Sequence, residues 1–452
     1  MLRRYAWLVG LPLTLGLAWL LWVAAPVGFA PGVAAPPVPD ATSALAQPLP
    51  RFLLQLLVVL AAAKFAGALM RRIGQPAVIG EMLAGIVLGP SLLGWAWPGL
   101  HAAVFPADGL GAFKLVSQLG VLVFMFAAGA EFELSRLRGQ RRLALVVGHA
   151  GIALPFLLGL LLAWPLAAAY APAGTDFIAF ALFLGVALSV TAFPVLLRII
   201  EERGYRGLPV ATLAIACAAV SDASAWAILG AVVAWTQSQG PGHLLLNLGL
   251  SAALAWALLG PLRARLTRQG EHASPPAAMV GLILMALACA LVTELIGLHL
   301  LFGAFLAGLA VSGSPALRDI VTQRIEPFAV VVLLPLFFAS TGLATRVDLL
   351  SGSEWLLCLG LTGVATLGKL GGTVLAARWC GVVPADAWRL GILMNTRGLM
   401  ELIVLSLGYE LGLIDQRLYA ILVLVAIITT VLTGPLLGWL DRSAGRTQSA
   451  AT

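Results

Sequence analysis

The chain has 452 residues, of which 61% are hydrophobic and only 10% are charged. A soluble domain of this size needs far more charge to cover its surface, so this composition excludes an ordinary soluble protein. The net charge is +7, but the arginines lie in short loops between apolar blocks, which indicates membrane topology rather than nucleic-acid binding.

The first fifty residues combine an apolar segment with a linker-like segment. Two arginines precede an apolar stretch from Tyr5 to Phe29, and an Ala-x-Ala pattern follows at 44–46. A signal peptide and an uncleaved extra helix both fit. We favour the extra helix, because the stretch exceeds the roughly 7–15 residues of a signal-peptide core. Residues 31–50 are rich in proline and alanine and are predicted to be a flexible linker.

Beyond residue 50 the apolar blocks have the length that a membrane-spanning helix needs, about 20 residues. We predict an all-α integral membrane protein with about thirteen transmembrane helices. Their approximate bounds are 51–72, 77–95, 113–131, 143–169, 177–200, 208–236, 243–266, 277–297, 299–313, 326–345, 354–379, 387–409 and 417–440.

The arginines test this arrangement, because loops on the cytoplasmic side of a membrane carry an excess of basic residues. One set of span ends carries eighteen arginines, whereas the other carries only Arg51, Arg346 and Arg417. The pattern predicts a multi-pass protein of the cell (inner) membrane, with residue 51 outside and the short tail, 441–452, in the cytoplasm.

The chain shows no pattern typical of a nucleotide, metal or cofactor site. The four cysteines have no metal-ligand spacing, and the five histidines are scattered without a hydrolase-like arrangement. We therefore expect a transporter rather than an enzyme, with no cofactor, driven by an ion gradient or by the gradient of its substrate.

Eight charged residues are predicted to lie within the spans, where each is a functional-site hypothesis because charge is costly at membrane depth. They are Lys64, Glu81, Lys114, Asp222, Glu294, Lys369, Arg397 and Glu401. Simple explanations exist for three of them. Lys64 can pair with a neighbouring helix, Lys114 can extend to the interface, and Glu294 lies near an outer end.

Asp222 is the strongest candidate for binding a transported ion. It lies in the middle of the sixth span among small residues, which leave room for a cavity. Desolvation favours the protonated carboxyl, whereas a nearby cation favours the carboxylate, so such a group can exchange a proton for a cation. The alternative is a static buried ion pair with Lys369, which lies mid-span in the eleventh helix. Lys369 is either the partner of a salt bridge or itself a proton carrier.

Two spans are predicted to be interrupted. The fifth contains Ser189, Thr191 and Pro194, and the twelfth contains the polar run Asn395-Thr396-Arg397-Gly398 followed by Glu401. Proline alone fits an ordinary kink. A pair of broken helices in oppositely oriented halves is typical of inverted-repeat transporters, whose ion sites lie where half-helices meet. Freed carbonyls near 189–191 are candidate cation ligands, and Arg397 and Glu401 are spaced to neutralise each other.

These residues resemble the monovalent cation:proton antiporters of the second cation/proton antiporter family. The similarity runs from about residue 51 to residue 440. The matching stretches are Gln75 to Pro90, Ser189 to Arg198, Ser221-Asp222, His299 to Gly308, Lys369 to Thr373, and Asn395 to Glu401.

The resemblance implies a homodimer that exchanges Na⁺ or K⁺ for H⁺ by elevator-like alternating access, in ion and pH homeostasis. It implies a core domain (143–236 and 354–440), a dimerisation domain (51–131 and 277–345) and a linker helix (243–266). Asp222 resembles the family's ion-binding aspartate and Lys369 the lysine opposite it. Glu81, within a matching stretch, is a candidate supporting residue.

One position departs from the electrogenic members, which have two adjacent aspartates. Here the first is Ser221, so a single carboxylate remains and we predict electroneutral exchange. The change also leaves Lys369 without its usual partner, and it does not distinguish Na⁺ from K⁺.

Two other transport functions fit less well. A proton-coupled anion carrier is possible because half-helix N-termini and Arg397 attract anions, although Asp222 would repel them. A K⁺ efflux channel would dissipate a K⁺ gradient without moving protons.

Overall fold

A computed structural model describes residues 47–449, except for 107–108, 132–140, 193–194, 197–198, 201–202, 206–207, 238–240, 270–274 and 297–298. Within this part of the chain the regular structure is entirely helical. Ten helices are long and apolar enough to cross a membrane. The predicted N-terminal apolar segment, the Ala-x-Ala pattern and Pro194 lie outside the described residues.

In the first part of the described chain the α-helices are α4 (Pro48–Arg72), α5 (Ala77–Leu88), α6 (Pro98–Val104), α7 (Gly111–Glu131), α8 (Arg141–Tyr170), α9 (Phe177–Ser189) and α11 (Pro209–Gln237). The remaining longer ones are α12 (Pro241–Ala257), α13 (Arg263–Gln269), α14 (Pro275–Leu295), α15 (Leu300–Val311), α18 (Leu334–Ala344), α19 (Gly352–Trp379), α20 (Pro384–Met394), α21 (Leu399–Glu410) and α22 (Gln416–Ser449). Short helical turns and π-helical segments join several of them.

The long helices coincide with ten of the predicted spans. The other three predicted spans, 177–200, 299–313 and 387–409, correspond to shorter helices. Of these, α9 and α15 are the short apolar helices, and α20 and α21 are two halves separated by four non-helical residues, 395–398. The short helices therefore mark where the chain departs from simple membrane crossing.

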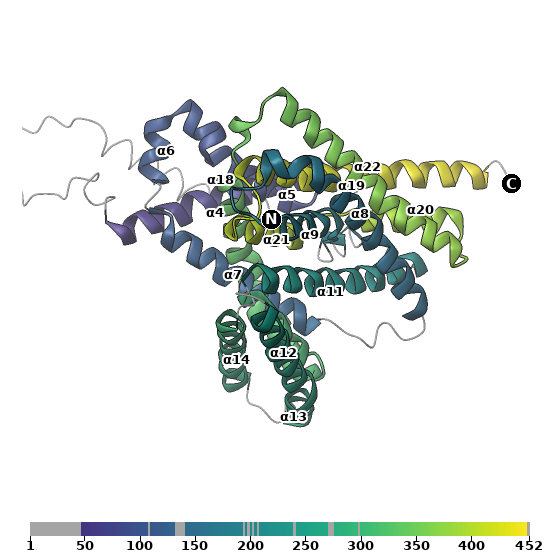
Figure 1. The fold of residues 1–452 in the computed structure, drawn as a ribbon, viewed down its shortest axis with the longest axis horizontal. Coiled ribbons are helices and arrows are strands. Elements are labelled where there is room, and N and C mark those ends of the chain that lie inside the picture. The colour runs from purple at the N-terminus through teal and green to yellow at the C-terminus, as the bar shows by residue number, and fades with distance from the viewer. Residues whose placement is uncertain are drawn as a thin grey trace, which may run out of the picture.

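The helices pack into two groups, which are seen side by side in Figure 1. In the first, called the α5–α18 group, α4, α5, α7, α14, α15 and α18 contact one another. In the second, called the α8–α19 group, α8, α9, α11 and α19–α22 do so. Helices α12 and α13 follow α11 and lead to α14, at the lower edge of Figure 1. Whether these groups act as the predicted functional domains remains a prediction.

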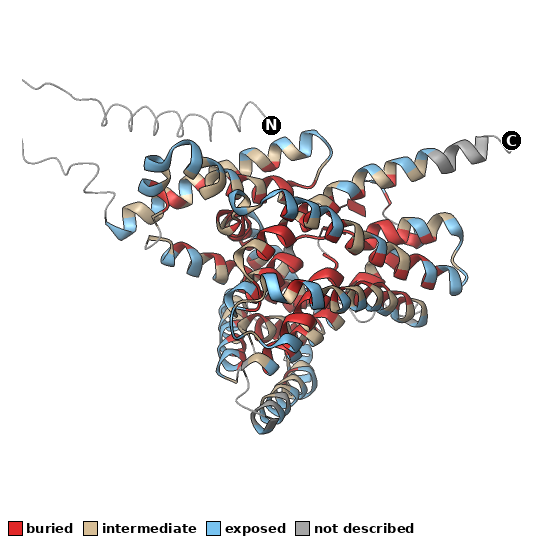
Figure 2. Ribbon diagram, turned by 45° about the horizontal axis from the view of Figure 1, so that its top comes forward, coloured by how far each residue is buried: buried red, intermediate tan, exposed pale blue. Residues whose placement is uncertain are grey.

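Apolar side chains cover much of the outside of the molecule. Phe65, Trp164, Leu367 and Trp379 are each more than 70% exposed, and Figure 2 shows buried residues concentrated where the helices meet. Large exposed apolar side chains on so many helices fit a protein whose surface faces lipid. Most of the buried polar residues, in contrast, lie in the α8–α19 group or in the segments that follow α9 and α20.

Candidate ion-binding site

The first helix break follows α9. Asp176 caps the start of this helix by accepting a hydrogen bond from the Ala179 N–H at 3.0 Å, and the helix ends at Ser189. Val190 is extended (φ −63°, ψ 142°), and residues 190–192 are not helical. The carbonyls at the end of α9 are thus released from the helical hydrogen-bond pattern, as helix C-termini are.

The second break separates α20 from α21. Gly398, the last residue before α21, has φ +156° and ψ −127°, a conformation that residues with a side chain rarely adopt. A Cβ at this position would lie 2.9 Å from Val195 Cγ2. Glycine is therefore required here both for the backbone turn and for the close approach of the chain that follows the first break.

The two breaks contact each other directly. The Ala192 N–H donates to the Thr396 carbonyl at 3.0 Å, and the Thr191 hydroxyl donates to the Met394 carbonyl at 3.1 Å. The Thr191 and Ser221 hydroxyl oxygens lie 3.5 Å apart. The fold therefore brings together the predicted residues of the fifth, sixth and twelfth spans at one buried crossing.

Basic side chains of the protein bind the carbonyl oxygens at the end of α9. Arg397 donates to the carbonyls of Ala187, at 2.9 Å, and Leu188, and the Lys369 ammonium donates to the carbonyl of Ser189. Positive charge at a helix C-terminus is favourable, because the helix dipole is negative there. The Ser189 carbonyl, which the sequence suggested as a cation ligand, thus holds Lys369 in this conformation.

Arg397 is neutralised within its own segment. Its guanidinium lies 2.6 Å from Glu401 Oε1, and both side chains are almost completely buried. This confirms the pairing that the four-residue spacing predicts. Because the pair is neutral and the guanidinium also binds two backbone carbonyls, the cluster is suited to holding the break in shape, although Arg397 Nε and Glu401 Oε2 have no hydrogen-bond partner among the described residues.

Asp222 and Lys369 form the second buried set of charges. Lys369 is fully buried on α19, and Asp222 on α11 is 7% exposed. Asp222 and Glu401 attract the Lys369 ammonium electrostatically, and Arg397 repels it. The structure thus places the two predicted titrating residues within electrostatic range, next to the crossing.

Polar side chains near the breaks are incompletely satisfied. Thr396 donates from its hydroxyl to the Leu393 carbonyl at 2.8 Å. The side-chain oxygen and nitrogen of Asn395 and the hydroxyl of Thr373 are buried and have no hydrogen-bond partner within the described part of the chain. Buried polar groups are normally paired, so these atoms are candidates to contact water or a passing ion.

Glu81 lies elsewhere. It is on α5, in the α5–α18 group, and its carboxylate lies 3.7 Å from the Lys64 ammonium on α4. Lys64 therefore does pair with a neighbouring helix, as its mid-span position predicts. The role of Glu81 as a support of the ion site stays a prediction.

Sequence reasoning missed Thr430 on α22. Its hydroxyl oxygen accepts from the Arg397 N–H at 3.1 Å and lies 2.6 Å from the Arg397 carbonyl. Thr430 also lines a cavity of about 290 Å³ together with Gln75 and Arg203. Adjacent threonines in an apolar span, Thr429-Thr430, were the only local signal of this contact.

The model of the family described as "Sodium/hydrogen exchanger, transmembrane" matches residues 57–441. The chain is 37% identical over 391 residues to the Na⁺/H⁺ antiporter NhaS4 of Synechocystis sp., covering 85% of this chain and 95% of that protein. It is 35% identical to cation/H⁺ antiporter 18 of Arabidopsis thaliana, covering 86% of this chain and 48% of the plant protein. The chain therefore spans about half the length of the plant relative.

Among solved structures, the sodium proton antiporter MjNhaP1 from Methanocaldococcus jannaschii has a similar fold, with a TM-score of 0.66. The alignment covers 87% of this chain and 98% of that one, at 15% sequence identity. At this identity the similarity supports the fold and not the details of the site.

Proposed function

The chain belongs to the sodium/hydrogen exchanger family of monovalent cation:proton antiporters, and from that premise we propose that it exchanges Na⁺ or K⁺ for H⁺ at Asp222. The observation that carries this proposal is the position of Asp222. Its buried carboxylate lies within electrostatic range of Lys369, whose ammonium is held at the end of α9.

Exchange follows from competition for one carboxylate. Burial favours a neutral Asp222, and the site satisfies this either with a proton or with a bound cation. The hydroxyls of Thr191 and Ser221, 3.5 Å apart, are oxygen ligands of the kind that alkali cations accept. With a single aspartate we propose electroneutral exchange, one proton for one cation.

We propose that the protein works as a homodimer in the inner membrane and that the α8–α19 group moves relative to the α5–α18 group in an elevator-like cycle. Helix contacts are extensive within each group, which supports movement of each as a body. The Arg397–Glu401 pair would travel with the site, because the partners that Arg397 has among the described residues lie in the α8–α19 group.

The test is ion exchange in liposomes that contain the purified protein and a trapped pH dye. A pH gradient is imposed, and Na⁺, K⁺ or Li⁺ is added in turn. We expect one or more cations to dissipate the gradient, and we expect Asp222→Asn to reduce the initial rate at least roughly 100-fold, since it removes the exchanging charge. Asp319→Asn, at an exposed carboxylate on the short helix Pro315–Ile320, is the matched control and should retain the wild-type rate.

Two results would contradict the proposal. Retained exchange in a folded Asp222→Asn protein would remove Asp222 from the site. Proton movement driven by added anions, and not by cations, would favour the anion carrier. Electroneutrality is tested separately on a solid-supported membrane, where wild type should give no transport current.

The cysteines offer a test of orientation. Cys380 is exposed at the end of α19, whereas Cys217, Cys289 and Cys358 are buried. We expect a membrane-impermeant maleimide to label Cys380 in inside-out vesicles and not in right-side-out ones. The reverse pattern would overturn the proposed cytoplasmic C-terminus.

A further inference from the structure

A second cavity, of about 310 Å³, lies between the two helix groups. The residues that line it are far from Asp222 in the sequence. On one side it is lined by α7 and α18, and on the other by α21 and α22. It lies near the helix ends next to Arg417, and we call this face the Arg417 side. A water molecule takes up about 30 Å³ in the liquid, so the cavity has room for several waters or a hydrated ion.

Glu410, the last residue of α21, supplies the carboxylate of this cavity. Its Oε1 lies 2.8 Å from the Lys114 ammonium and 3.4 Å from the Gln118 side-chain nitrogen, both on α7. Among the ion pairs seen in the described residues, this is the only one that joins the α5–α18 group to the α8–α19 group. Neither side chain is fully buried, so the pair is within reach of water.

Oxygen atoms line the same cavity. Thr341 on α18 is 2% exposed, and its hydroxyl has no hydrogen-bond partner among the residues that the structure describes. The Tyr419 hydroxyl lies 3.5 Å from the Thr341 carbonyl, and Ser406 also lines the wall. A carboxylate with several neutral oxygens is the ligand type that hard cations prefer.

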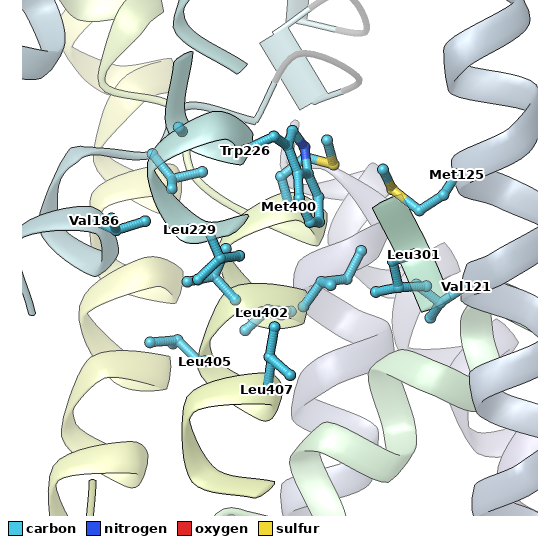
Figure 3. Packing of buried hydrophobic residues seen from close by; sticks show 14 of the residues in the cluster. Val121, Met125, Val186, Trp226, Leu229, Leu301, Met400, Leu402, Leu405 and Leu407 are labelled. Atoms are coloured by element: carbon cyan, nitrogen blue, oxygen red, sulfur yellow. The ribbon is translucent and has the colours of Figure 1, made fainter. Parts of the chain in front are cut away.

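Apolar side chains adjoin this cavity. A smaller cavity of about 40 Å³ shares Glu410 with the first and is lined in part by Leu301 and Ile403. These two residues belong to one hydrophobic cluster with Trp226 and Leu229, which follow Asp222 by one and two turns of α11. Figure 3 shows side chains of this cluster from α7, α9, α11, α15 and α21.

We propose that this cavity is a second binding site for the monovalent cation, on the Arg417 side, in which the Lys114 ammonium takes the cation's place in the present conformation. The inference rests on the proposed exchange activity. When the groups move apart on this side, Lys114 on α7 separates from Glu410 on α21, and the carboxylate becomes available to an arriving ion before that ion reaches Asp222.

The test measures the half-saturating cation concentration for cation supplied from each face in turn, in vesicles of both orientations identified by Cys380 labelling. From the Arg417 side, Lys114→Gln should lower this concentration roughly fivefold and Glu410→Gln should raise it roughly fivefold. Thr341→Val should raise it roughly threefold without changing any charge. From the opposite face all three variants should match wild type.

Two variants control for general surface charge. Arg346 and Asp348 form an exposed pair at 2.6 Å on the same side, but neither lines the cavity. Arg346→Gln and Asp348→Asn should therefore leave the half-saturating concentration unchanged. If they shift it as much as the cavity variants do, surface potential explains the effect and the site does not exist.

The alternative role for the pair is a simple latch between the groups. Both Lys114→Gln and Glu410→Gln would then break the same contact and shift the concentration in the same direction, for cation supplied from either face. That result, or no shift at all in a wild type that exchanges, would overturn the second site. Absence of exchange in wild type would instead contradict the proposed function.

Discussion

The two buried basic side chains next to the helix breaks are held in different ways. Arg397 is balanced within its own segment by Glu401 at 2.6 Å, binds two carbonyls of α9, and is fixed through its backbone by Thr430. Lys369 donates to the Ser189 carbonyl, is repelled by Arg397, and is attracted electrostatically by carboxylates that include Asp222, on a different helix.

This difference suggests a division of roles. A compact charge pair within one segment is poorly placed to exchange its proton, because each change leaves a buried charge uncompensated. Asp222 and Lys369 lie on separate helices, so an incoming ion can take over the neutralisation of their charges. We therefore assign a structural role to the Arg397–Glu401 pair and the role in ion transport to Asp222 and Lys369.

The largest expected effect on stability comes from breaking the Arg397–Glu401 pair. Arg397→Met leaves Glu401 buried without its partner, and we expect it to lower the free energy of unfolding by about 3–5 kcal/mol. The double variant Arg397→Met/Glu401→Met removes both charges and should recover a large part of this loss. Denaturant titration in detergent measures both. A double variant less stable than Arg397→Met would show that the charges themselves are not the reason.

A smaller effect is expected at the turn before α21. Gly398→Ala places a Cβ against Val195 in a conformation that alanine rarely adopts, and we expect a loss of about 1–3 kcal/mol. Gly363→Ala is the matched control, because this helical glycine has open space around it and alanine favours helices. Equal stability of the two variants would mean that the break does not need glycine.

The smallest of these effects concerns Thr430. Thr430→Val leaves the backbone N–H of Arg397 without its acceptor, which should cost about 1–2 kcal/mol and slow exchange modestly. Thr433→Val on the same helix removes only a local bond to the Thr429 carbonyl and serves as the control. If both variants behave alike, the contact with Arg397 has no special role.

The sequence indicated much of this arrangement because membrane insertion leaves strong local signals. Apolar length located the spans, and buried charge identified Asp222, Lys369, Arg397 and Glu401. The i, i+4 spacing of Arg397 and Glu401 also predicted their contact, although Arg397 lies in the non-helical segment just before α21.

Contacts between segments that are distant in the sequence could not be predicted from these local signals. Lys114 was expected to extend to the interface, but it pairs with Glu410, 296 positions along the chain. Thr430 looks like an ordinary polar residue until α22 packs against the break. The Ser189 carbonyl was expected to be available, and only the folded structure shows that Lys369 reaches it.

The most direct test of the division of roles is proton release by purified protein in weakly buffered detergent solution when Na⁺ or K⁺ is added. We predict that wild type and the Arg397→Met/Glu401→Met variant release about one proton per chain, whereas Asp222→Asn releases none. Release that persists in Asp222→Asn and disappears from a folded double variant would contradict the account and move ion exchange to the Arg397–Glu401 pair.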